Sequence, residues 1–278
     1  MKKTKTIVTT VLIVLIFVAG LGLMLYPTIS DYISSLSHKR VISDYVSSVE
    51  NLDESTYTEL LTQAEIYNTR LAARKGSLTT LSDEAAKEYY SILDVNGTGV
   101  MGYVQIPSLD LSLPIYHGSD DAVLQVGVGH LEGSSLPVGG ESCHTILTGH
   151  RGLPSSQLFT SIDKLVEGDV FMLRVLKETF TYQVDQIETV LPSELSSLVI
   201  VDGEDYCTLV TCTPYGVNTH RLLVRGRRIE NFSDTDEIPI GSYGQTETKP
   251  VNILILISIA VAVALVPTVI ITARRRRS

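Results

Sequence analysis

The sequence predicts a mostly β domain, a barrel or a sandwich, preceded by helices and flanked by two membrane-spanning helices. Three observations support this prediction. Between residues 99 and 228, short β-rich segments are separated by Gly, Pro, Asp and Asn, the pattern of an all-β barrel or sandwich. Before them, apolar residues recur at helical spacing. Near each end of the chain lies an apolar run of about 20 residues or slightly more.

The two apolar runs have the length and flanks of membrane spans. Residues 7–26 carry no charge and follow three lysines, and residues 251–273 are followed at once by four arginines. About 20 apolar residues suffice to cross a hydrocarbon core roughly 30 Å thick. Basic residues outside both runs predict cytoplasmic termini and an extracytoplasmic segment between the runs.

Other interpretations of these runs stay open. The first could be a cleaved signal peptide, because its basic start fits one, but its length and the absence of a small-x-small cleavage site after Pro27 favour an uncleaved anchor at 1–26. The second resembles the tail of a cell-wall sorting signal, but no Leu-Pro-x-Thr-Gly precedes it. Pro267 is compatible with a membrane helix. We therefore expect a C-terminal helix at 251–273 and a basic cytoplasmic tail at 274–278.

Residues 27–95 are predicted to be helical. Apolar residues at spacings of three and four indicate two helices between residues 28 and 73, separated near 51–55, where Asp53 or Ser55 can act as a cap. A third helix is expected at 82–93, capped by Ser82. This segment shows no candidate chemistry, so we expect a stalk that holds the β-domain away from the membrane.

The β-domain is expected at 96–230, followed by a polar linker at 231–250. Short helices are expected near 120–124 and 157–165. The predicted strands are 100–106, 111–116, 144–147, 170–175, 179–184, 206–211 and 221–227.

Charge and cysteine content exclude several classes of function. All 31 acidic residues lie between the two apolar runs, whereas seven of the 22 basic residues flank them, which leaves this portion at a formal charge of −16. Such a domain is a poor candidate for binding nucleic acid or an anionic lipid surface. Three cysteines make no disulfide framework. No cofactor or metal is expected, and the composition favours a surface enzyme of a single-membrane, Gram-positive bacterium.

Cys212 is the strongest candidate nucleophile. It ends an apolar, β-branched strand and is followed by a turn at Pro214 that would leave its sulfur open to solvent. Free cysteine is also a common core residue, which is the better interpretation for Cys143 and Cys207; these two could instead pair. Arg221 begins the next strand, so a hairpin of this length can bring its guanidinium beside Cys212.

His150 is the favoured base among six histidines, the others being His38, His117, His130, His144 and His220. It follows an apolar strand, and glycines on both sides of the His150-Arg151 pair suit a tight turn that frees the ring. His220 is the competitor, but neighbouring strand residues face opposite ways. If Arg221 faces Cys212, His220 does not. A thiol, an imidazole and a guanidinium are the groups needed for acyl transfer through a thioester.

At these residues the sequence resembles the sortase family, and most of all its pilus-assembling class C group. The resemblance is carried by residues 148–152 (TGHRG) and 208–226 (TLVTCTPYGVNTHRLLVRG), supported by 102–107 (GYVQIP) and 113–118 (LPIYHG). It covers roughly residues 96–228. A second membrane span after the domain is also typical of class C.

The resemblance implies an eight-stranded β-barrel transpeptidase without a cofactor. Cys212 would be the nucleophile, His150 the general acid/base and Arg221 the oxyanion or substrate clamp, with Thr211 helping to position substrate. Cys212 would cleave an LPxTG-like signal at its Thr–Gly bond and form a thioacyl enzyme. A lysine amine on the next pilin would resolve it. Two alternatives stay open: a housekeeping sortase that anchors proteins to peptidoglycan, and a non-catalytic, membrane-tethered β-domain that binds a surface partner.

Class C sortases usually carry an N-terminal lid with an Asp-Pro-aromatic motif, and residues 72–96 of the lid-equivalent region contain no Asp-Pro pair. We therefore predict that deleting residues 73–81 changes the rate of cleavage of an LPxTG-type peptide little. A large acceleration in the deletion variant would show that this segment occludes the site.

Overall fold

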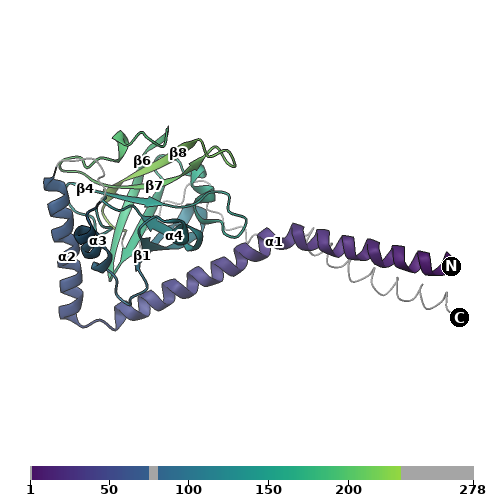
Figure 1. The fold of residues 1–278 in the computed structure, drawn as a ribbon. Coiled ribbons are helices and arrows are strands. Elements are labelled where there is room, and N and C mark those ends of the chain that lie inside the picture. The colour runs from purple at the N-terminus through teal and green to yellow at the C-terminus, as the bar shows by residue number, and fades with distance from the viewer. Residues whose placement is uncertain (1, 75–80, 233–278) are drawn as a thin grey trace. The chain divides into compact units, whose positions relative to one another are not determined.

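The computed structural model describes residues 2–74 and 81–232 (Figure 1). The described residues divide into two units, one ending at residue 32 and the other beginning at residue 33. The predicted linker lies largely outside the described residues, and the C-terminal membrane helix lies entirely outside them. The second unit contains the β-domain and the candidate site.

Eight strands close into a barrel in the order β1-β2-β3-β4-β7-β8-β6-β5. The β2–β3 and β4–β7 pairs are parallel and the others antiparallel. The strands are β1 (Val100–Ile106), β2 (Leu111–His117), β3 (Val128–His130), β4 (Cys143–Thr148), β5 (Val170–Val175), β6 (Glu178–Val190), β7 (Asp205–Thr213) and β8 (His220–Ile229). Closure pairs every strand on both sides and leaves no free edge.

All seven strands expected from the sequence are present, and the closed barrel resolves the choice between barrel and sandwich. The eighth strand, β3, was missed because three residues are too short to show an alternating pattern. β6 extends six residues beyond the predicted end at Val184, across an irregularity in its pairing with β8 between Val184 and Gln186. The short helix expected near 157–165 is a 3-10 helix, η2 (Leu158–Lys164).

The second and third predicted N-terminal helices begin and end close to the expected positions, whereas the first is continuous with the predicted membrane span and extends back through Pro27 to Lys2. The three helices are α1 (Lys2–Glu50), α2 (Glu54–Ala73) and α3 (Asp83–Ser91), with α4 (Asp121–Val126) between β2 and β3 and short 3-10 turns η1 (Pro107–Leu109) and η3 (Ser196–Leu198). The Asp53 carboxylate accepts a hydrogen bond from the Thr56 amide at 2.9 Å, and Ser82 accepts one from the Ala85 amide. Both residues thus satisfy otherwise unpaired amides at helix starts.

A stalk alone does not describe residues 27–95, because α1, α2 and α3 contribute to the hydrophobic core of the barrel unit. The buried Tyr45 hydroxyl donates to the Met101 carbonyl at 3.0 Å. Asn68 of α2 donates to the Leu136 carbonyl and accepts from its amide, at 3.0 and 2.7 Å. The apolar residues whose helical spacing suggested a stalk form the stripe by which these helices pack on the barrel.

One helix among the described residues is long and apolar enough to cross a membrane. The candidate runs from Val11 to Glu50, and its most apolar window has a mean hydropathy of 2.4 with none of it buried. This fits the predicted N-terminal anchor, although a signal sequence has the same properties.

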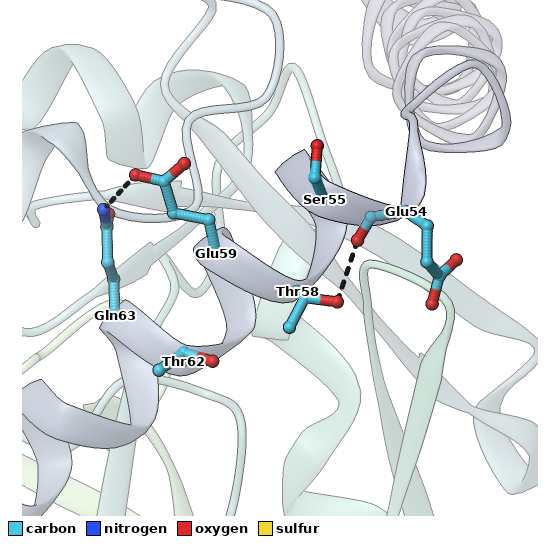
Figure 2. A pocket seen from close by; sticks show the side chains of 6 residues that line it. All are labelled: Glu54, Ser55, Thr58, Glu59, Thr62 and Gln63. Carbon is cyan, nitrogen blue, oxygen red and sulfur yellow. Dashed lines mark hydrogen bonds between the residues drawn. The ribbon is translucent and has the colours of Figure 1, made fainter.

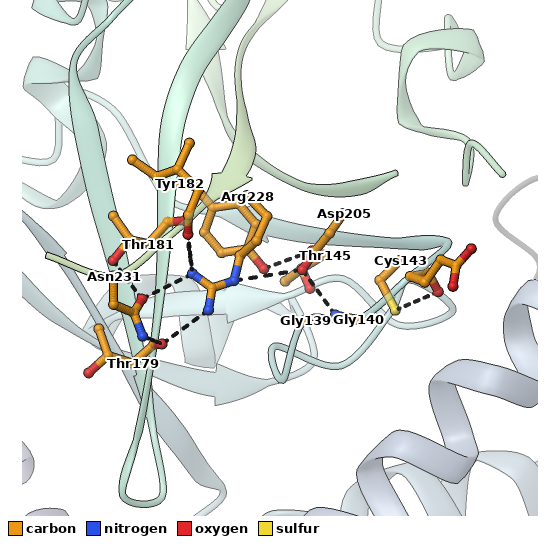
Figure 3. A network of polar contacts seen from close by, with 12 residues as sticks. Gly139, Gly140, Cys143, Thr145, Thr179, Thr181, Tyr182, Asp205, Arg228 and Asn231 are labelled. Carbon is orange, nitrogen blue, oxygen red and sulfur yellow. Dashed lines mark hydrogen bonds and ion pairs between the residues drawn. The ribbon is translucent and has the colours of Figure 1, made fainter. Parts of the chain in front are cut away.

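A polar network fastens the end of β8 to the start of β7 (Figure 3). Arg228 donates to the Thr181 carbonyl at 3.1 Å and to Asn231 Oδ1 at 3.0 Å. Asp205 accepts from the Tyr182 hydroxyl and the Gly140 amide, both at 3.0 Å. Burial raises the pKa of the Asp205 carboxyl. This network holds β7 at the end opposite to Cys212.

Cys143 and Cys207 are free, buried thiols, as the sequence favoured. Burial raises the pKa of Cys143 to about 12, with a smaller contribution from Asp205. Burial also raises the pKa of Cys207 well above its ordinary value. Neither thiol is suited to nucleophilic attack, because the thiolate is the reactive form.

We predict that His130 makes the fold less stable in acid. Its ring is fully buried, with Nε2 bonded to the Ser135 carbonyl at 2.8 Å and Nδ1 bonded to the Tyr89 hydroxyl at 2.9 Å. Burial lowers its pKa to about 4, whereas the unfolded chain takes up this proton near pH 6.5. The free energy of unfolding therefore stays constant with respect to His130 above about pH 6.5. It falls by about 3 kcal/mol as the pH drops from about 6.5 to 4, because the unfolded chain binds this proton first.

Urea unfolding of the detergent-solubilised chain from pH 7 to 4, followed by circular dichroism, measures this effect. His130→Gln flattens the pH dependence, while the control His220→Gln, at a half-buried position, leaves it as in the wild type. An unchanged slope in His130→Gln would contradict the prediction.

Candidate active site

The β7–β8 hairpin sets Arg221 directly opposite Cys212 in the antiparallel register. Thr213 pairs with His220 one step nearer the turn. The turn uses left-handed backbone at Gly216 and Asn218, with φ of 75° and 61°, which these two residue types adopt most readily. The hairpin thus aligns the two side chains that the sequence paired by spacing alone.

The parallel pairing of β4 with β7 brings the chain at His150 to the level of Cys212. Thr148 pairs with Val210, and the Gly149 amide donates to the Val210 carbonyl at 3.1 Å. Each strand therefore continues two residues past its last pair, to His150 in one case and Cys212 in the other. The positions of Cys212, His150 and Arg221 converge at one end of the β4–β7–β8 sheet.

Burial separates Cys212 from the other two cysteines, and His150 from three of the other histidines. Cys212, His150 and Arg221 are each half-buried, as a site open to substrate requires. By contrast, His117, His130 and His144 are buried, with both ring nitrogens in hydrogen bonds. These three are structural histidines.

His220 is half-buried, and its Nδ1 lies 2.9 Å from the Thr219 hydroxyl. Because adjacent strand residues face opposite sides, His220 and Arg221 are directed to different faces of β8. This arrangement favours His150 over His220 as the partner of Cys212.

Thr211 lies behind the site rather than in it. Its side chain is only 2% exposed, on the barrel face opposite to Cys212, and its hydroxyl donates to the Gly149 carbonyl at 2.7 Å. The resemblance predicted that Thr211 helps to position substrate. In this structure its contact is to the backbone of the loop that carries His150.

A largely apolar groove of about 230 Å³ lies on the outer face of the same strands. Val210 and Thr148, each two residues before a candidate catalytic side chain, line it together with Arg221. The other lining residues are Ser119, Leu124, Leu131, Ile146, Val190, Leu191, Pro192, Glu194, Leu195, Leu198 and Leu223. Such a groove suits a short peptide with apolar side chains next to the bond that reacts.

A second hollow, of about 630 Å³, offers no comparable chemistry. It lies along one face of α2 and is lined by Glu54, Ser55, Thr58, Glu59, Thr62 and Gln63 (Figure 2). The two contacts drawn there, Thr58 to the Glu54 carbonyl and Gln63 to Glu59, join residues one helical turn apart. The larger volume therefore reflects an open helix surface, and the smaller groove is the better candidate.

Sequence reasoning missed the segment from Val190 to Leu198, which supplies about half of the apolar wall. Its residues carry no catalytic group and show no regular pattern, so only the chain path places them beside the site. Among the described residues, no group of three or more His, Cys, Asp or Glu side chains is arranged to hold a metal.

Comparison with known proteins agrees with the family resemblance found in the sequence. A family model described as the sortase domain matches residues 104–229. Sortase C1 of Streptococcus agalactiae is 52% identical in a match that covers 69% of this chain and all of that one, with a TM-score of 0.68. Sortase C of Streptococcus pneumoniae, whose structure is described as informative on pilin substrate specificity, is 44% identical over 69% of this chain and 97% of its own, with a TM-score of 0.62.

Sortase D of Bacillus subtilis is 29% identical over 178 residues, which cover 62% of this chain and 86% of the relative. The barrel, the convergence of Cys212, His150 and Arg221, and these similarities lead to one assignment: the chain belongs to the sortase family of cysteine transpeptidases, in its class C group.

Proposed function

We propose that this enzyme polymerises pilins by cleaving an LPxTG-like sorting signal and transferring the acyl group to a pilin lysine. The observation that carries the proposal is the register of the β7–β8 hairpin, which sets Arg221 opposite Cys212 beside an apolar groove. The similarity to sortases C favours pilins over a peptidoglycan acceptor.

In the first half-reaction, Cys212 gives its thiol proton to His150, and the sulfur attacks the carbonyl carbon of the signal's threonine. A C–S bond forms, and the C–N bond to glycine breaks. His150 gives a proton to the departing amine, as a general acid. The Arg221 guanidinium stabilises the oxyanion, a role that arginine fills as a cationic hydrogen-bond donor and not as a base.

In the second half-reaction, the ε-amine of a pilin lysine attacks the thioester. His150 accepts the proton from the amine, the C–S bond breaks and an isopeptide bond forms. One amide bond is exchanged for another, so the reaction needs no cofactor or external energy source. The groove would hold the apolar part of the signal while the amine approaches.

The proposed location follows from the apolar helix and the flanking charges. The N-terminal helix would anchor the enzyme in the cell membrane with the barrel outside, and both termini would be cytoplasmic according to the positive-inside rule. A pilin that carries the sorting signal would then meet the enzyme on the outer side of the membrane.

Substitution of the three candidate catalytic residues tests the mechanism. Cys212→Ala abolishes cleavage of a fluorogenic peptide carrying an LPxTG-type signal and removes pilin ladders from cells, because no thioester forms. His150→Ala lowers kcat/KM by about 10²–10⁴-fold, and Arg221→Ala lowers it by about 10²–10³-fold.

Each substitution has a matched control elsewhere in the barrel: Cys143→Ala, His220→Ala and Arg225→Ala. These variants keep most of the activity, because their side chains lie outside the groove and the proposed triad. A normal ladder in Cys212→Ala would reject the nucleophile, and a larger loss in His220→Ala than in His150→Ala would identify His220 as the catalytic imidazole.

A lysine introduced into the wall of the groove tests whether the groove binds the sorting signal. Leu195 lines the groove and is 41% exposed, and Val201 is 42% exposed but outside the lining. Leu195→Lys raises KM for the peptide on the order of tenfold, because about one apolar contact is lost and a charge is introduced. Val201→Lys leaves KM unchanged. Equal KM values for the two variants would place the signal elsewhere.

A further inference from the structure

Arg151, the residue after His150, has a nearly buried guanidinium, with a side chain only 9% exposed. Its Nη1 donates to the Thr213 hydroxyl at 3.1 Å, and its Nη2 forms an ion pair with Asp163 of η2. The guanidinium carbon also lies 5.9 Å from the centre of the Tyr215 ring. One side chain therefore connects the loop after β4, the end of β7, the following turn and η2.

These contacts join the two halves of the candidate site. Arg151 directly follows His150, and Thr213 directly follows Cys212. Their hydrogen bond is thus one residue removed from both the proposed general acid and the proposed nucleophile. On the other side of the loop, the His150 carbonyl accepts from the Phe159 amide at 3.1 Å, and the Gly152 amide donates to the Thr160 hydroxyl at 3.0 Å.

Stability alone does not account for this arrangement. Only the arginine of this pair is buried, because the Asp163 side chain is 39% exposed. Burying a guanidinium costs desolvation energy that one partly exposed partner recovers poorly, and an apolar side chain in its place is often at least as stabilising. Within the described residues, the Arg151 Nε is buried without a hydrogen-bond partner, which adds a further cost. What a planar guanidinium does supply is fixed, directional contacts to two groups at once.

We propose that Arg151, oriented by Asp163, is a positioning residue that fixes the His150 ring relative to the Cys212 sulfur through its hydrogen bond to Thr213. This inference rests on the proposed roles of His150 and Cys212. Proton transfer to the leaving amine requires the His150 ring to be placed accurately. A displacement of about 1 Å can lower the rate by up to about 10²-fold. The role therefore appears in the rate of the chemical steps and not in substrate binding.

Four variants of the detergent-solubilised full chain test this role, with kcat and KM measured on a fluorogenic peptide carrying Leu-Pro-Glu-Thr-Gly. Arg151→Met keeps the side-chain length, removes the buried charge and lowers kcat about tenfold or more, with unchanged KM and a melting temperature at or above that of the wild type. Thr213→Val has the same kinetic effect, whereas Thr213→Ser, which retains the hydroxyl, restores most of the rate. Asp163→Asn lowers kcat by a smaller factor, because an amide oxygen can still accept from Arg151.

Two controls complete the experiment. Asp185→Asn removes another arginine–carboxylate pair, the 2.9 Å contact with Arg225, and retains wild-type kinetics. The double variant Arg151→Met/Thr213→Val is no slower than the slower single variant, since both changes remove the same contact.

Wild-type kcat in Arg151→Met or Thr213→Val would overturn the positioning role, as would multiplicative losses in the double variant or a rate loss that only follows a lower melting temperature. Cys212→Ala in the same assay separates this failure from failure of the proposed function. If Cys212→Ala is inactive while Arg151→Met is normal, the transpeptidase mechanism stands and only the positioning role is lost.

Discussion

The parallel pairing of β4 with β7 is the constraint on which the site depends. These strands are separated by more than fifty residues of sequence, and their register, continued through the Gly149 amide, brings His150 level with Cys212. Barrel closure fixes that register, because both strands have a second neighbour that prevents slippage. The polar network around Asp205 and Arg228 fastens β7 at its other end (Figure 3).

The same architecture separates reactive groups from structural ones by burial. Cys143 and Cys207 are buried, and burial raises their pKa values. Three histidines are held with both ring nitrogens in hydrogen bonds. At the end of the β4–β7–β8 sheet, the strand register brings together the half-buried positions of a thiol, an imidazole and a guanidinium. The chemistry therefore arises from location, since each residue type occurs elsewhere in the chain.

Support for this end of the barrel comes from residues that do not face the groove. Thr211 bonds the Gly149 carbonyl from the inner face, and Arg151 connects Thr213 to Asp163. The N-terminal helices have a comparable supporting role: Tyr45 and Asn68 bond backbone groups of the barrel unit. A segment that looks like a tether in sequence is in fact part of the folded unit.

The sequence by itself determined the helix boundaries near residues 51–55 and at Ser82, seven of the strands and the triad candidates, because caps, alternation and turn residues are local signals. It did not determine β3, which is too short for a pattern, or the groove wall from Val190 to Leu198, which has none. Nor did it show that Thr211 faces inward onto Gly149 or that Arg151 reaches Asp163. Those contacts join residues distant in sequence, and only closure of the barrel decides which distant residues meet.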